Sequence, residues 1–71
     1  MKVIHAYGIK DGKETLIFQN VVYSAASVYN MRQAMQRGGY ELSRAYISAD
    51  QSNGYKPVEI TNELKERMAA L

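Results

Sequence analysis

The alternation of apolar and polar residues predicts a β-hairpin in the first third of the chain. Residues 2–10 and 14–23 are both rich in Val, Ile, Tyr and Phe, and Asp11-Gly12 separates the two runs. An Asp-Gly pair between two such runs is typical of a two-residue hairpin turn. We therefore expect two antiparallel strands joined at this pair.

The register of that hairpin decides which residues share a face. A two-residue loop puts Tyr7 opposite Leu16, His5 opposite Phe18 and Ala6 opposite Ile17. One face is bulkier than the other, and we expect it to lie under a helix; it carries Val3, His5, Tyr7, Ile9, Leu16 and Phe18. A bulged turn would slip the register by one residue and swap the faces of one strand.

Residues 24–38 predict the central helix. Apolar residues recur on one side at helical spacing: Ala25, Val28, Met31 and Met35, with Ala34 on the flank. Ser24 is placed to cap the first turn by accepting a hydrogen bond from a free amide. Gly38-Gly39 then supply the left-handed residue that often ends a helix.

The second half of the chain predicts further strands and a short helix. Residues 41–49 read as a third strand, and Asn53-Gly54 is a second hairpin candidate that leads to a short edge strand or extended segment at 55–60. That turn would set Ala49 opposite Val58 and Ile47 opposite Ile60. A final helix follows over 62–71, with Thr61 as its expected cap.

These elements predict a small α+β fold of order ββαβ(β)α. The 71 residues are enough for one domain, so we assign 1–71 to a single domain with a mainly antiparallel sheet packed on the central helix. A chain of this length buries only about 60% of the surface that its unfolded form exposes. Since it contains no cysteine for a disulfide, self-association is the remaining common way to add stability.

The composition argues against an enzyme or a metalloprotein. His5 is the single histidine and there is no cysteine, so the chain lacks the usual three or four Cys and His ligands of a zinc site. No nucleophile has a neighbouring base and orienting acid, and no glycine pattern cradles a phosphate. We therefore expect no catalytic residues, no metal and no cofactor.

Two surfaces are candidates for binding. On the outer side of the central helix, residues three and four apart form a polar cluster with an exposed tyrosine: Tyr29, Arg32, Gln33 and Gln36. Tyrosine and arginine are over-represented among binding hot spots, so we expect this cluster to contact a partner protein. A second, apolar set is expected to bury against another copy of the chain, and it comprises Leu64, Met68, Leu71, Ile4, Ile17 and Tyr46.

The function that the sequence favours is a non-enzymatic protein-binding module, an adaptor or inhibitor that forms a homodimer. The alternative is a nucleic-acid binder that uses the open sheet face, with Tyr7 and Tyr46 stacking on bases and Arg44 and lysines on phosphates. The net charge of only +2 disfavours that alternative, and Tyr7 and Tyr46 would share a face only if the register slipped. No stretch approaches the roughly 20 apolar residues of a membrane span, so we expect a cytoplasmic protein.

Overall fold

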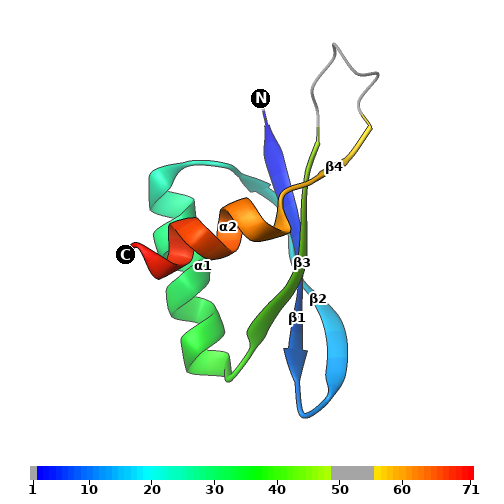
Figure 1. The fold of residues 1–71 in the computed structure, drawn as a ribbon, viewed down its shortest axis with the longest axis vertical. Coiled ribbons are helices and arrows are strands. Elements are labelled where there is room, and N and C mark those ends of the chain that lie inside the picture. Colours follow the sequence, from blue (N-terminus) through cyan, green and yellow to red (C-terminus); the bar gives the residue numbers. More distant parts are fainter. Residues whose placement is uncertain (1, 49–55) are drawn as a thin grey trace.

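The protein folds as a four-stranded antiparallel sheet with both helices on one face (Figure 1). This computed structural model describes residues 2–48 and 56–71. The strand order across the sheet is β2-β1-β3-β4. Along the chain the elements are β1 (Val3–Lys10), β2 (Lys13–Val22), α1 (Ala25–Gly38), β3 (Glu41–Ser48), β4 (Val58–Glu59) and α2 (Thr61–Ala69). The predicted α+β class and the order ββαβ(β)α are confirmed.

The first hairpin has the predicted two-residue turn. Lys10 pairs with Lys13, and the two loop residues Asp11 and Gly12 have φ values of 53° and 75°. Two successive positive φ values are the mark of a type I′ turn, whose twist matches that of the strands it joins. The predicted pairing of Tyr7 with Leu16 follows from this turn and is confirmed.

Beyond that pair, β2 contains bulges that the sequence prediction missed. Ala6 pairs with Phe18 rather than with Ile17, so Ile17 is an extra residue in β2. Both Ile17 and Phe18 pack against the hydrophobic core, because a bulge turns two successive side chains toward one face. A second shift precedes the pairing of Ile4 with Val21.

A bulge in β3 also changes its faces. Tyr7 pairs with Arg44, but Gly8 pairs with Leu42, which leaves Ser43 as the extra residue. Leu42 therefore packs toward the core, whereas the alternation of a regular strand would place it on the face of Arg44.

Helix α1 begins and ends as predicted. The Ser24 Oγ accepts a hydrogen bond from the Ser27 N–H at 3.1 Å, and the Ser27 Oγ accepts one from the Ser24 N–H at 2.9 Å. This reciprocal pair is a capping box, which satisfies two amides that have no partner inside the helix. Gly39 ends the helix in the left-handed conformation at φ 76°.

The segment that leads into α2 departs from the prediction in its register and in its cap. Ile47 pairs with Val58 instead of Ile60, and the proposed turn at Asn53-Gly54 lies outside the described residues, as does Ala49. Thr61 does not cap α2, which starts without a side-chain cap. Its Oγ instead accepts a hydrogen bond from the Ala45 N–H at 3.0 Å and so ties α2 to β3.

The core lies between the helices and the face of the sheet that carries Ile4, Ala6 and Ala45. Within residues 2–48 and 56–71, eight apolar residues are buried there: Ile4, Ala6, Val28, Met31, Met35, Ala45, Leu64 and Met68. The prediction that the face of His5 and Tyr7 lies under the central helix is therefore wrong. Small residues, Ala6 and Ala45, lie where the helices approach, and the methionines and leucine of the helices supply the bulk.

Gly8 lies at a close approach between β1, β2 and Tyr40. A β-carbon at Gly8 would lie 2.7 Å from the Ile17 Cδ1 and 3.2 Å from the Tyr40 Cβ. Real side chains almost never approach so closely, so any larger residue here would displace its neighbours. The buried face thus depends on small residues rather than large ones.

Candidate functional site

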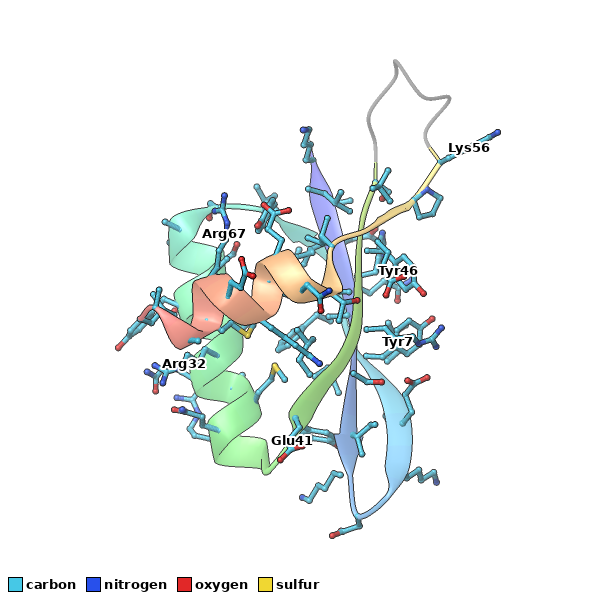
Figure 2. The ribbon with its side chains drawn as sticks, viewed as in Figure 1. Tyr7, Arg32, Glu41, Tyr46, Lys56 and Arg67 are labelled. Carbon is cyan, nitrogen blue, oxygen red and sulfur yellow. The ribbon has the colours of Figure 1, made fainter. Side chains whose placement is uncertain are left out.

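The uncovered face of the sheet, opposite the helices, is the main candidate site. Its side chains come from β1, β2 and β3, and Figure 2 shows Tyr7 and Tyr46 projecting from the sheet away from both helices. We call this surface the outer face and define it by His5, Tyr7, Ile9, Glu14, Leu16, Ser43, Arg44 and Tyr46. No helix covers it in the described part of the chain.

Arg44 is the centre of the outer face. Its guanidinium carbon lies 4.4 Å from the centroid of the Tyr7 ring and 5.9 Å from that of Tyr46. Its Nη1 donates a hydrogen bond to the Tyr46 hydroxyl at 3.3 Å. Stacking on an aromatic face suits the planar, weakly hydrated guanidinium group, so two tyrosines and one arginine form a single cluster.

An ion pair holds Arg44 in this position. Its Nη2 and Nε donate to the two carboxylate oxygens of Glu14 at 2.7 and 3.2 Å, and Ser43 donates to the same carboxylate. These bonds, from Arg44 first and from Ser43 second, lower the pKa of the Glu14 carboxyl below its ordinary value. The two-pronged geometry fixes the orientation of the guanidinium more firmly than a single hydrogen bond would.

His5 lies beside this cluster and is engaged at both ring nitrogens. The Asn20 N–H points to its Nδ1 at 3.4 Å, and its Nε2 lies 3.1 Å from the Ser48 Oγ. An accepting Nδ1 leaves the Nε2–H to donate to Ser48. The imidazole is half-buried in this position.

Tyr7 and Tyr46 share one face, which the sequence analysis allowed only with a slip of register. No slip of the turn is needed, because β1 pairs with β3 in a register that sets His5 opposite Tyr46 and Tyr7 opposite Arg44. Sequence reasoning missed Glu14 and Ser43 entirely. The bulge that turns Ser43 onto the outer face leaves no signal in the apolar pattern.

The predicted partner-binding cluster on α1 is only partly exposed. Tyr29 is 52% exposed and Gln36 is exposed, whereas Arg32 and Gln33 are half-buried. Arg32 and Gln36 line a groove between α1, α2 and β3, and neither Tyr29 nor Gln33 lines it. Only two of the four residues therefore line a common groove. The binding role of the predicted cluster stays a prediction.

The residues predicted for self-association are scattered. Ile4 and Leu64 are fully buried and Met68 nearly so, all inside one chain, so they have no surface left for a second copy. Ile17 packs on the core, while Tyr46 belongs to the outer face. Leu71, which is 51% exposed, is the member of the set that projects most into solvent at the end of α2.

The described ranges contain neither a cluster of metal ligands nor a helix able to span a membrane. Across residues 2–48 and 56–71, no three His, Asp or Glu side chains gather closely enough to hold a metal ion. Neither helix has the length and apolar character needed to cross a membrane.

Comparison with known proteins adds no family. No protein-family model, curated protein or solved structure matches the chain. The site must therefore be interpreted from its own geometry.

Proposed function

We propose that this protein is a non-enzymatic binding module, an adaptor or inhibitor that docks on another protein through its outer face. The observation that carries the proposal is the Arg44 guanidinium held between Tyr7 and Tyr46 on the side of the sheet that no helix covers. Tyrosine and arginine are the residue types that contribute most often to protein-binding hot spots.

The cluster is already organised in the free chain, which supports the proposal. Glu14 fixes Arg44 with two hydrogen bonds, and the hydroxyl of Tyr46 is fixed in turn by Arg44. Binding costs less when the contacting side chains do not have to be immobilised, at about 0.5–1.5 kcal/mol for each flexible side chain.

The surroundings of the cluster favour a protein partner. Leu16 and Ile9 lie on the same face and are 42% and 39% exposed. Because Glu14 neutralises Arg44, the centre of this face carries no excess charge. An aromatic and aliphatic surface with internal charge pairing resembles the centre of a protein interface, where unpaired charges are depleted.

The test is capture of partners from lysate of the source cell, followed by binding measurements with the purified partner. We expect Tyr46→Ala to weaken the complex by at least about tenfold, as a hot-spot truncation of about 1.4 kcal/mol or more does. Asn62→Ala, an exposed change on α2, is the matched control and should bind as the wild type.

The Tyr29→Ala variant distinguishes binding through the outer face from binding through the predicted cluster on α1. If Tyr29→Ala abolishes binding and Tyr46→Ala does not, the site lies on α1 and the outer-face proposal is wrong. Circular dichroism of each variant shows whether a loss of binding is a loss of fold.

The second candidate is binding of single-stranded nucleic acid, and the shared face of Tyr7 and Tyr46 favours it. Aromatic rings on an open sheet face are used as stacking platforms for bases. The ion pair of Arg44 with Glu14 argues against it, because that cation is already neutralised.

A titration with mixed single- and double-stranded DNA and RNA tests this second candidate. We expect no affinity tighter than micromolar near physiological salt. Submicromolar binding that falls steeply with salt and is lost in Arg44→Ala would favour nucleic acid.

The proposal includes a cytoplasmic location and a homodimer. The absence of cysteine suits a reducing compartment, although it does not require one. Leu71 supports the homodimer, as its side chain is half exposed at the end of α2. A two-fold contact of the two α2 ends is the simplest arrangement that would bury it.

A further inference from the structure

A groove of about 300 Å³ lies on the helical side of the molecule, where α1, α2 and the start of β3 meet. Figure 2 shows Arg32 on α1 and Glu41 at the start of β3. The groove is lined by Arg32, Met35, Gln36, Tyr40, Glu41, Leu42, Lys65 and Met68. It is separate from the outer face, which lies on the other side of the sheet.

The apolar lining comes from side chains that the core already holds in place. Met35 and Met68 are buried, and Tyr40 and Leu42 are half-buried against the same core cluster. Tyr40 and Leu42 therefore supply the apolar surface of the groove that another molecule can contact, and the two methionines support it from below. The groove therefore offers an apolar contact without any change of fold.

The groove is lined by two cations, Arg32 and Lys65, and by one carboxylate, Glu41, so its lining has a net positive charge. Neither Arg32 nor Lys65 has an ion pair or hydrogen bond to another side chain in residues 2–48 and 56–71, whereas Arg44 and Arg67 each pair with a glutamate. Lys10 adds a third cation, with its Nζ 5.5 Å from the centroid of the Tyr40 ring.

We propose that this groove docks a short acidic segment of a partner protein that carries an apolar side chain next to its carboxylates. The carboxylates would pair with Arg32 and Lys65, and the apolar side chain would pack on Tyr40 and Leu42, the half-buried apolar residues of the lining. A volume near 300 Å³ lies at the lower limit of ligand sites, so it suits one or two side chains rather than a whole cofactor. This site goes beyond the proposed function, because the outer face would remain free for a different protein.

Nuclear magnetic resonance titration of the full chain tests the proposal with defined probes. The first probe is a capped hexapeptide of alternating glutamate and leucine. The second replaces glutamate by lysine, and the third replaces leucine by serine. We expect the first peptide to bind most tightly and to shift the amides of Gln36, Tyr40 and Lys65, and we expect its affinity to fall as salt is raised.

Charge-removing variants identify the groove. Arg32→Gln and Lys65→Gln should each weaken binding of the glutamate-leucine peptide by about two- to five-fold, as expected for partly exposed ion pairs. Arg37→Gln is the matched control: it removes an exposed cation of α1 that does not line the groove, and should leave the affinity unchanged.

Three results would overturn the proposal. They are equal binding of the lysine-leucine peptide, shifts confined to Tyr7 and Tyr46 on the outer face, and no loss of affinity in Arg32→Gln and Lys65→Gln. Tighter binding of a short single-stranded oligonucleotide at the same amides would also overturn it, because the groove would then be a phosphate site. Tyr46→Ala leaves the groove intact, so failure of the outer face does not affect this test.

Discussion

Arg44 lies over the ring of Tyr7, its partner on the neighbouring strand, with the guanidinium carbon 4.4 Å from the ring centroid. From this position it reaches across β1 to Glu14 on β2, although β2 and β3 are not adjacent in the sheet. One side chain thus links three strands on the outer face. The cluster therefore has a definite geometry within the chain itself.

The first prediction concerns the pH dependence of this link. Arg44 holds the pKa of the Glu14 carboxyl below its ordinary value, so the carboxylate is favoured in the folded state. A lowered pKa means that the pair contributes stability above the ordinary carboxyl pKa and loses it as the pH falls through the folded-state pKa. We expect Arg44→Gln to raise the pKa of Glu14 in a carbon-detected titration of the carboxyl group.

Arg37→Gln serves as the control for that titration. It removes a cation from the last turn of α1, where no contact with Glu14 exists, and should leave the Glu14 pKa where it is. An unchanged pKa in Arg44→Gln would show that the ion pair does not persist in solution.

The second prediction tests the close approach at Gly8. Gly8→Ala places a methyl group 2.7 Å from the Ile17 Cδ1, which is the end of a flexible side chain and can shift. We therefore expect a loss near the lower end of the roughly 1–3 kcal/mol that overpacking costs. Ile17→Val removes the Cδ1 atom itself. We therefore expect the double variant to lose less stability than the sum of the two single variants, as measured by chemical denaturation. Additive losses would mean that Tyr40, 3.2 Å away at its Cβ, causes the strain instead.

The third prediction concerns the start of α1. Ser24→Ala removes the acceptor for the Ser27 N–H, and loss of such a cap costs about 1 kcal/mol. Ser24→Asp keeps an acceptor and adds a negative charge at the positive end of the helix dipole, so it should be at least as stable as the wild type. The unfolding temperatures of the wild type, Ser24→Ala and Ser24→Asp test this order. An unchanged unfolding temperature in Ser24→Ala would show that water satisfies the amides of the first turn equally well.

The elements that the sequence predicted well depend on local signals. Asp11-Gly12 specifies its turn by the φ values it tolerates, and Ser24 and Gly39 specify the ends of α1 by their own hydrogen bonds and conformation. Thr61 shows the limit of such reasoning. It is a good capping residue by type, but its hydroxyl is engaged by the Ala45 amide of a distant strand.

The buried face of the sheet could not be predicted from side-chain bulk. Side-chain bulk favoured the face of His5 and Tyr7. In the structure the helices supply the large side chains, and the sheet presents the small residues Ala6 and Ala45 to them. Which face is buried is a property of the assembled layers, and no single strand encodes it.

The sequence predicted the outer face only in part, for a related reason. Tyr7, Arg44 and Tyr46 were candidates by residue type, but their meeting depends on the pairing of β1 with β3. That pairing joins segments about forty residues apart, and the bulge at Ser43 shifts its register. Local patterns carry little information on such long-range registers.

The last prediction separates a structural role of α2 from a role in self-association. Met68 is nearly buried within the chain, whereas Leu71, which follows the end of α2, is half exposed. We expect Met68→Ala to lower the free energy of unfolding by about 2–5 kcal/mol, since it leaves a cavity in the core, and this is a large share of the stability of so small a domain.

Leu71→Glu should leave the unfolding temperature nearly unchanged, because exposed substitutions usually alter stability by no more than about 0.5 kcal/mol. If two copies pair through the end of α2, Leu71→Glu should convert a dimer to a monomer in light scattering at high micromolar concentration. A wild-type protein that is monomeric under those conditions would remove the homodimer from the proposal and leave the role of Met68 in the core unaffected.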